Sequence, residues 1–214
     1  MNHTIKKFFQ NTRRPEGYGG KIMVSVMNRG HAPLSKWGFT YLSPRKDDSV
    51  LDIGCGGGAN IAKLLKKCAD GTVTGIDYSQ VSVDKAAFIN RKAVAAGRCI
   101  IVRGSVSDLP FEDDTFNLVT AFETVYFWPD IVDSFRNVYR VLKNDGIFFI
   151  CNETDGQNKN DQRWTDIIDG FTIYTAGQLA AYLREAGFSE TVIAGNGDKH
   201  WVCVMAKKKG TIHI

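Results

Sequence analysis

A short apolar segment that runs directly into a cluster of glycines constrains the fold of this chain more than any other feature. The sequence Val50-Leu-Asp-Ile-Gly-Cys-Gly-Gly-Gly-Ala59 has the pattern of a buried strand followed by glycines at 54, 56, 57 and 58. Glycine lets the backbone turn sharply and lets a ligand touch bare backbone N–H groups. The pattern predicts a strand-to-helix turn with a ligand site beyond the carboxyl end of the strand.

From Ser49 onward, apolar runs alternate with helical patterns. Strands are predicted at 49–53, 72–77, 99–103, 116–122 and 146–151, and helices at 60–67, 79–96, 131–142 and 176–186. Two further β-like runs, 190–194 and 200–206, flank a short turn at Gly195-Asn-Gly197. The alternation predicts a Rossmann-like, doubly wound α/β fold, with a mostly parallel seven-stranded sheet and an antiparallel C-terminal hairpin at one edge.

The N-terminal part has a different pattern. Residues 1–47 contain prolines, glycines and two short helical patches, 21–28 and 33–41, and we expect them to form an N-terminal arm or helical cap. Residues 48–214 are then the main domain. The polar stretch 152–174 is expected to be a lid insertion, helical around 164–169.

Composition gives no sign of a nucleic acid or membrane partner. The 214 residues carry 27 basic and 23 acidic side chains, a net charge of +4, and part of that surplus lies in the tail run 207–209. The five cysteines are never spaced C-x-x-C, so we expect reduced, mostly buried thiols and no metal site. The first 17 residues lack an apolar stretch and so do not form a secretory signal, which predicts a cytoplasmic protein. We expect it to be a monomer or a homodimer.

Two acids accompany the glycines. Asp52 precedes the first glycine by two positions, where a carboxylate repels a dinucleotide pyrophosphate and attracts a cationic sulfonium or ammonium group. Asp77 closes the second strand, where a carboxylate can accept both hydroxyls of an adenosine ribose. The structural alternatives are that Asp52 only binds neighbouring N–H groups, and that Asp77 only stabilises the helix N-terminus after Ser79.

Four segments together resemble the class I S-adenosylmethionine-dependent methyltransferases, in their small-molecule branch with a methyltransferase-11/25-like core. They are residues 50–58, 75–79, 104–119 and 141–148, and the likeness covers about 48–151. The resemblance implies S-adenosylmethionine as cofactor. It also implies in-line transfer of a methyl group to a small-molecule acceptor, with S-adenosylhomocysteine as product.

The resemblance also implies which residues bind the cofactor. Gly54 and Gly56, with Cys55 between them, would approach its methionine portion. Phe122, at the end of strand four, would line the same pocket.

The adenosine portion would meet a second group of residues. Asp77 would bind the ribose with Tyr78 beside the adenine, and Ser105 and Val106 would lie at the polar edge of the adenine. The family commonly has an acid where Ser105 stands, so this contact would be weaker here. It also commonly has Phe-Asp where this chain has Phe-Asn117.

The segment Phe122-Glu-Thr-Val-Tyr-Phe-Trp-Pro-Asp130 would face the acceptor. Tyr126 is a candidate to orient or deprotonate it, Trp128 to form an apolar wall, and Glu123 to stabilise the cationic cofactor or an acceptor amine. The alternatives are core packing for Trp128 and a solvated loop acid for Glu123. Neither an Asn/Asp-Pro-Pro-aromatic motif nor a Pro-Cys pair is present, which argues against a nucleic acid acceptor.

Two residues of the arm are further candidates on the acceptor side. His31 is a candidate catalytic group and Trp37 a candidate acceptor contact, if the arm covers the cofactor cleft. The alternative for His31 is a surface or helix-capping histidine.

Two other functions use the same architecture. One is an NAD(P)-dependent oxidoreductase, which Asp52, the Leu109-Pro-Phe111 segment and the absence of a Tyr-x-x-x-Lys pair disfavour. The other is a non-catalytic protein that binds S-adenosylmethionine.

Overall fold

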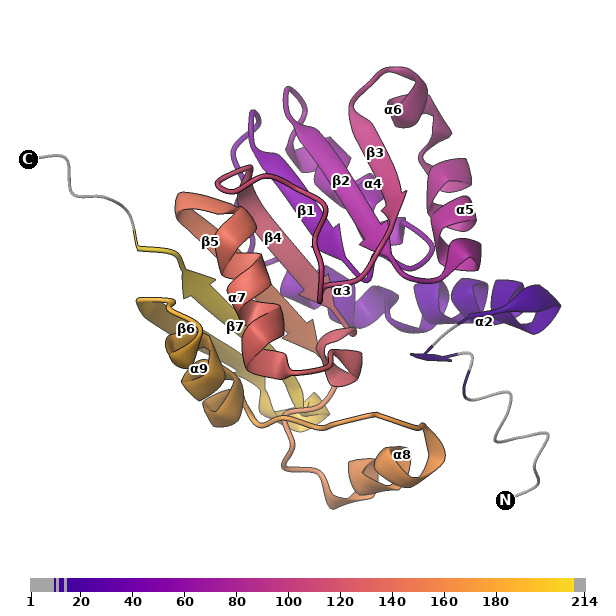
Figure 1. Cartoon of the computed structure of the whole chain (residues 1–214). Coiled ribbons are helices and arrows are strands. Elements are labelled where there is room, and N and C mark those ends of the chain that lie inside the picture. Colours follow the sequence, from indigo (N-terminus) through magenta and orange to yellow (C-terminus); the bar gives the residue numbers. More distant parts are fainter. Residues whose placement is uncertain (1–9, 11, 14, 210–214) are drawn as a thin grey trace, which may run out of the picture.

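A computed structural model describes residues 10, 12–13 and 15–209 and contains one seven-stranded sheet, in the order β3-β2-β1-β4-β5-β7-β6 (Figure 1). The strands are β1 (Ser49–Ile53), β2 (Thr72–Asp77), β3 (Cys99–Arg103), β4 (Phe116–Phe122), β5 (Leu142–Asn152), β6 (Glu190–Asn196) and β7 (Trp201–Lys207). Strands β1 to β5 pair in parallel, and β7 pairs antiparallel with both β5 and β6. The predicted fold class is confirmed.

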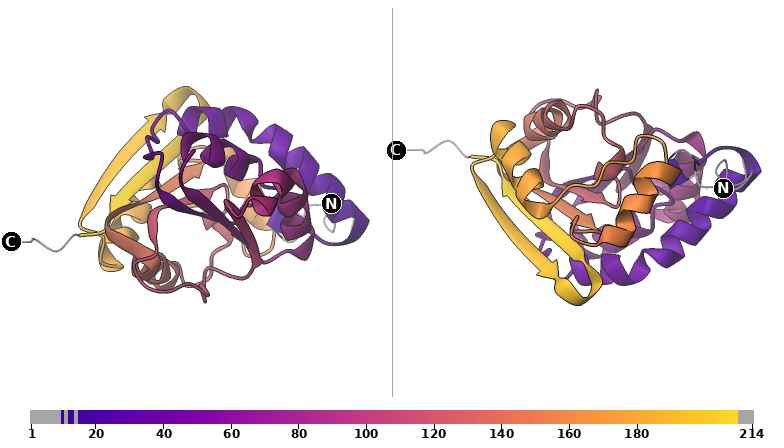
Figure 2. Two further views of the ribbon diagram at one scale, coloured as in Figure 1. Left: turned by 90° about the horizontal axis from the view of Figure 1, so that it is seen from above. Right: turned by 90° about the horizontal axis from the view of Figure 1, so that it is seen from below.

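Helices cover both faces of this sheet (Figure 2). They are α2 (Gly17–Gly30), α3 (Ala32–Gly38), α4 (Ala59–Lys67), α5 (Gln80–Ile89), α6 (Arg91–Ala95), α7 (Ile131–Val141), α8 (Gln162–Ile167) and α9 (Ala176–Glu185). Short 3-10 turns are η1 (Val125–Phe127), η2 (Lys159–Asp161) and η3 (Gly197–Lys199).

Each face of the sheet has its own apolar core. On one face, Phe135 of α7 and Leu179 of α9 pack with Phe148 of β5. On the other, Leu34 of α3 and Ile61 of α4 belong to a second cluster. The fully buried strands therefore read in the sequence as continuous apolar runs, which is why their bounds were predictable.

Several predicted elements have other bounds in the structure, and the helical patch expected at 21–28 extends over Gly17–Gly30. The helix expected to run from Ser79 to Ala96 is divided at Asn90, whose buried side-chain amide donates to the carbonyl oxygens of Gly58 and Ala86, both at 3.0 Å. Strand β5 begins four residues before the predicted Gly146. The hairpin turn is also displaced, because β6 continues through Asn196 and the chain reverses in η3.

Helices α2, α3 and α8 lie near the carboxyl ends of the parallel strands (Figure 1). The Ser79 hydroxyl donates to the carbonyl oxygen of Pro15 at 2.6 Å, and the Tyr78 hydroxyl donates to that of Arg13. The Arg13 guanidinium in turn donates to the carbonyl oxygen of Asp169 at 3.0 Å. Arg13 and Pro15 thus join the end of β2 to the segment that follows α8.

Two further expectations from the sequence concern the cysteines and membrane-spanning helices. All five cysteines lie buried with free thiols. Within residues 10, 12–13 and 15–209, no helix has the length and apolar character needed to cross a membrane.

Candidate functional site

The glycine loop after β1 is shaped by left-handed backbone at Gly54 (φ +69°) and Gly56 (φ +51°). The N–H groups of Gly54 and Cys55 both donate to the carbonyl oxygen of Ile76, at 2.8 and 3.1 Å, which ties the loop to β2. A Cβ added at Gly54 would collide with the Thr124 side chain, whereas one at Gly56 would meet no atom within 4 Å. The loop is therefore packed against protein at Gly54 and open at Gly56.

Asp77 holds this loop against the helix that follows β2. Its Oδ2 accepts from the Gly56 N–H and its Oδ1 from the Ser79 N–H, both at 2.9 Å. Burial raises the pKa of the Asp77 carboxyl, and the two backbone hydrogen bonds oppose that rise. These two bonds, with the Ser82 side chain as a further hydrogen-bond partner, leave part of the acceptor capacity of the carboxylate unused.

A cavity of about 120 Å³ lies beside the loop. Its walls include residues of the N-terminal segment (Thr12, Arg13, Pro15), helices α2 and α3 (Asn28, His31, Leu34, Ser35), the ends of β1 and β2 (Gly54, Cys55, Gly56, Asp77, Tyr78), helices α4 and α5 (Ala59, Asn60, Lys63, Ser82) and the end of β4 (Phe122, Glu123, Thr124, Phe127). Seven of the sequence candidates thus line one cavity: Gly54, Cys55, Gly56, Asp77, Tyr78, Phe122 and Glu123. His31, the candidate of the arm, lines it too.

Asp52 lies beneath the loop and outside the lining of this cavity. Its side chain is 1% exposed, and its Oδ1 accepts from the Thr120 hydroxyl of β4 at 2.6 Å. Its Oδ2 has no hydrogen-bond partner in the described part of the chain. Burial raises the pKa of Asp52 to about 7, because the Thr120 hydrogen bond only partly offsets the desolvation of the charge.

The other cofactor candidates differ in their positions. Phe122 lines the cavity and stacks on Phe39 of the arm behind it, with ring centroids 5.2 Å apart. Ser105 forms an isolated bridge with Asp108, and Val106 is buried in the core. Neither Ser105 nor Val106 is among the described residues that line the cavity.

Glu123 follows β4 directly, with a left-handed backbone (φ +57°). Its side chain is 10% exposed, and its Oε1 accepts from the Tyr126 hydroxyl at 3.1 Å and from the Glu153 N–H. Burial and the neighbouring Glu153 charge raise the pKa of the Glu123 carboxyl well above its usual range. Burial and the charge of Glu123 likewise raise the pKa of Tyr126. Glu123 is thus a held, buried acid rather than a solvated one.

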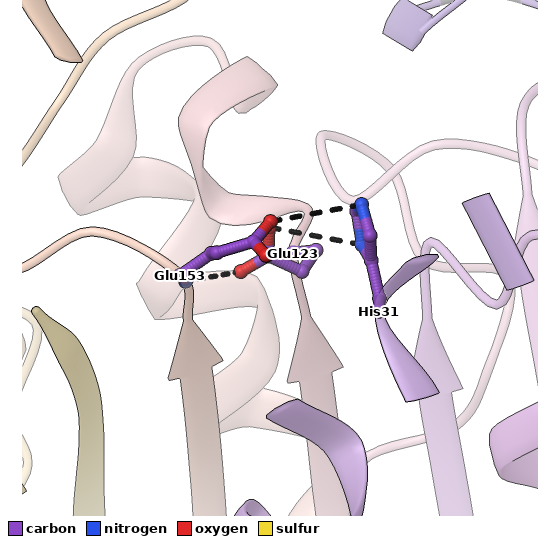
Figure 3. A group of neighbouring side chains, drawn as sticks. All are labelled: His31, Glu123 and Glu153. Carbon is purple, nitrogen blue, oxygen red and sulfur yellow. Dashed lines mark hydrogen bonds and ion pairs between the residues drawn. The ribbon is translucent and has the colours of Figure 1, made fainter. Parts of the chain in front are cut away.

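His31 connects α2 to α3 and faces two carboxylates (Figure 3). Its Nδ1 lies 3.7 Å from Glu123 Oε2, and its Nε2 lies 3.8 Å from Glu153 Oε2. Burial lowers the pKa of His31, and the Glu153 charge partly opposes this. One nitrogen or oxygen from each of the three side chains lies within 4.8 Å of the others, a grouping that could hold a metal ion.

The two tryptophan candidates pack against other rings. Trp128 stacks on Phe148 in the core with ring centroids 5.9 Å apart, and its indole N–H donates to Thr124 Oγ1 at 3.3 Å. Trp37 packs on Trp201 at 5.8 Å. These contacts of Trp128 and Trp37 are ring packing, the alternative that the sequence left open for Trp128.

Sequence reasoning missed Glu153, Thr124 and the N-terminal residues that line or border this site. Glu153 carried one signal, because it comes directly after strand five, and parallel strands end at the same edge of the sheet. Arg13 and Pro15 carried none, since their contacts with Tyr78 and Ser79 join residues more than 60 positions apart.

Residues 51–150 match the family model described as a methyltransferase domain. The chain is 36% identical over 115 residues to YrhH of Bacillus subtilis (strain 168), named as a candidate methyltransferase, across 54% of this chain and 63% of that protein. It is 34% identical over 101 residues to cycloartenol-C-24-methyltransferase 1 of Oryza sativa subsp. japonica, across 47% of this chain and 29% of that protein. The alignments thus span less than two thirds of these curated relatives.

The fold also matches solved structures. One is geranyl diphosphate C-methyltransferase from Streptomyces coelicolor A3(2), in complex with Mg²⁺, geranyl diphosphate and S-adenosyl-L-homocysteine. The TM-score is 0.72 at 15% identity, and the match covers 91% of this chain and 85% of that one. At this identity the likeness concerns the fold alone.

Proposed function

Because residues 51–150 belong to the class I S-adenosylmethionine-dependent methyltransferases, we propose that this chain transfers a methyl group from S-adenosylmethionine to a small-molecule acceptor. The product of the cofactor is then S-adenosylhomocysteine. The observation that carries the proposal is the open position at Gly56 beside the Asp77 carboxylate, inside the cavity.

The residues present fit this cofactor. Gly56 leaves space that any side chain would fill, and Asp77 keeps lone pairs for the ribose hydroxyls. The buried Asp52, with one unpartnered oxygen and a pKa of about 7, would add negative potential beneath this loop in its ionised form, facing positive sulfur. Gly54, Cys55 and Phe122 would bound the methionine portion, and Tyr78 the adenosine portion.

When bound, the cofactor supplies a methyl group on a positively charged sulfur, which leaves as a neutral thioether without protonation. The residues of this chain therefore have to align the acceptor and exclude water. Phe122 provides an apolar wall, and Glu123, which the Tyr126 hydroxyl contacts, lines the cavity where β4 ends, next to Thr124. Tyr126 would act by holding Glu123 and, through it, the acceptor.

The N-terminal segment has to move for the cofactor to bind. The cavity of about 120 Å³ is smaller than the roughly 300 Å³ at which sites for drug-sized ligands begin. Arg13 and Pro15 form one of its walls, next to Tyr78 and Ser79, where the adenosine portion would lie. Displacement of this segment enlarges the cavity without disturbing the sheet, so we propose that residues 1–47 act as a cap on the domain.

A small-molecule acceptor is supported by the sterol methyltransferase among the relatives and by the enclosed cavity. The alternative of a non-catalytic protein that binds S-adenosylmethionine makes a different prediction for turnover. A metabolite panel assayed for release of S-adenosylhomocysteine separates the two functions, because only an enzyme forms that product.

Calorimetric titration tests the cofactor directly. We expect saturable binding of S-adenosylmethionine and none of NAD. Asp77→Asn should weaken binding by about tenfold or more, the equivalent of one hydrogen bond to a charged group. Asp84→Asn, at an exposed position of α5, is the matched control. No saturable binding of S-adenosylmethionine by the unaltered chain, or binding of NAD in its place, overturns the proposal.

A further inference from the structure

Three side chains from distant parts of the sequence converge beside the cavity, and two of them, His31 and Glu123, line it (Figure 3). Glu123 follows β4 and Glu153 follows β5, and these strands are parallel neighbours in which Phe122 pairs with Cys151. His31 reaches the two carboxylates from the junction of α2 and α3. The sheet register therefore fixes the two acids relative to each other, and the arm adds the imidazole.

The cluster brings two carboxyl groups together in a partly buried place. Glu123 is nine-tenths buried, and within the described residues neither Glu123 nor Glu153 forms an ion pair with a lysine or arginine. The ionisable nitrogen group beside them is the imidazole of His31, with its Nδ1 3.7 Å from Glu123 Oε2 and its Nε2 3.8 Å from Glu153 Oε2. Two carboxylates beside one imidazole, in a partly desolvated place, favour a bound cation.

The donor set also fits a particular class of cation. Donor atoms around a tetrahedral or octahedral divalent ion lie roughly 3 to 4.4 Å apart, close to the 4.8 Å limit within which these three atoms lie. An imidazole nitrogen is a preferred ligand of first-row transition metals, and Mg²⁺ favours oxygen ligands alone. Three protein ligands leave coordination positions for water or for an acceptor atom, as in catalytic metal sites.

Neighbouring groups already fix the orientation of one carboxylate oxygen of Glu123. Glu123 Oε1 accepts from the Tyr126 hydroxyl and from the Glu153 N–H, and Oε2 lies 3.7 Å from His31 Nδ1. This leaves Oε2 directed toward His31. Hydrogen bonds of this kind fix the orientation of metal-binding carboxylates in known sites.

We propose that His31, Glu123 and Glu153 bind one divalent first-row transition-metal ion beside the methyl-transfer cavity. Glu153, with a side chain 47% exposed, gives the ion a path from solvent. The ion would take an acceptor atom at its free positions, and this last step alone rests on the proposed function.

Metal binding can be measured without any acceptor or cofactor. The full chain, treated with a chelator and dialysed free of it, is titrated with MnCl₂ while electron paramagnetic resonance reports free Mn²⁺, and separately with ZnCl₂ by calorimetry. We expect one equivalent per chain. His31→Gln and Glu153→Gln should each weaken binding by about tenfold or more. Both positions are partly exposed, so thermal melting should show that these variants stay folded.

His200→Gln is the matched control, because His200 Nδ1 lies 3.2 Å from Asp155, a single carboxylate outside the cluster. Its affinity for the ion should equal that of the unaltered chain. No saturable binding of either ion, or binding that survives both His31→Gln and Glu153→Gln, overturns the metal site. Titration of S-adenosylmethionine into the chelator-treated chain is a separate readout, so loss of the metal site and loss of cofactor binding are distinguishable.

Discussion

The Gly56 N–H donates to the Asp77 carboxylate at 2.9 Å and so couples the glycine loop after β1 to the end of β2. The bond holds Gly56 in its left-handed conformation, with no atom within 4 Å of the place that a Cβ would occupy. The loop is thus fixed by its N–H group and open on its Cα side.

Gly56→Ala tests whether this open side receives the cofactor. The added methyl meets no protein atom but projects beside a cavity-lining backbone, so we expect affinity for S-adenosylmethionine to fall by at least about tenfold. The left-handed backbone should cost about 1 kcal/mol of stability. Calorimetry and thermal melting measure the two effects.

Gly97→Ala is the control for that strain. Gly97 has φ +70° and no atom within 4 Å of a Cβ, as at Gly56, but it lies after α6 and outside the described lining of the cavity. Its melting temperature should fall by a similar amount with affinity unchanged. Equal affinities of the two variants would contradict a cofactor at Gly56.

Gly20→Ala should release the N-terminal segment. A Cβ at Gly20 would lie 2.7 Å from the carbonyl carbon of Pro15, a backbone atom that has to shift. We expect faster tryptic cleavage at Arg13 and faster association of S-adenosylmethionine in stopped-flow measurements. Gly30→Ala, in the same helix with no atom within 4 Å, gains the same helix propensity and should change neither rate. Unchanged cleavage in Gly20→Ala would contradict the displacement.

Asp52→Asn should flatten the dependence of stability on pH. The pKa of Asp52 is about 7 in the folded chain, above its unfolded value, so the native state binds more protons and stability falls as pH rises from about 4 to 7. The variant keeps an oxygen for the Thr120 hydroxyl and removes the charge. At pH 8 it should be more stable than the unaltered chain by up to about 4 kcal/mol.

Urea unfolding at pH 5 and pH 8 measures this difference. Asp70→Asn, at an exposed position, should leave the pH profile unchanged. A profile of Asp52→Asn that runs parallel to that of the unaltered chain would show that Asp52 does not titrate in this range.

Lys208→Met should destabilise the fold although Lys208 belongs to a basic tail run. Its side chain is buried and donates to Leu142 O at 2.7 Å and to Asp114 Oδ1 at 2.8 Å. Loss of these bonds should cost about 1–3 kcal/mol. Lys207→Met, which removes an ion pair of a half-exposed lysine with Asp145, should cost less than about 1 kcal/mol. Denaturant unfolding compares the two, and equal losses would contradict the burial of Lys208.

Those lysines also show how far the sequence alone can lead. Adjacent residues of one type, Lys207 and Lys208, point to opposite sides of the chain end, and only the tertiary structure decides which is buried. Strands β1 to β4 were predictable to the residue, because each is a short apolar run bounded by turn or helix signals, and β1 and β4 are almost wholly buried. The division of the helix at Asn90 was not, because it depends on a hydrogen bond to Gly58, 32 positions away.

The residues of the candidate site likewise include some that the sequence could predict and some that it could not. Gly54, Gly56 and Asp77 were predictable because local backbone geometry demands them at the tips of two neighbouring strands. The grouping of His31 with Glu123 and Glu153 was not, since nothing in the sequence around His31 reveals where α2 places it. Tyr126 was expected near the acceptor, and the structure adds that its hydroxyl holds Glu123.

The place of β7 between β5 and β6 has a consequence for synthesis of the protein. Strand β6 pairs with no strand other than β7 in the described sheet, so a nascent chain released as far as Asn196 has nowhere to dock it. The edge of β5 stays uncovered until translation has passed Lys207 and the ribosome has released that residue. Ribosome-bound chains stalled shortly before that point should therefore be the ones that chaperones engage.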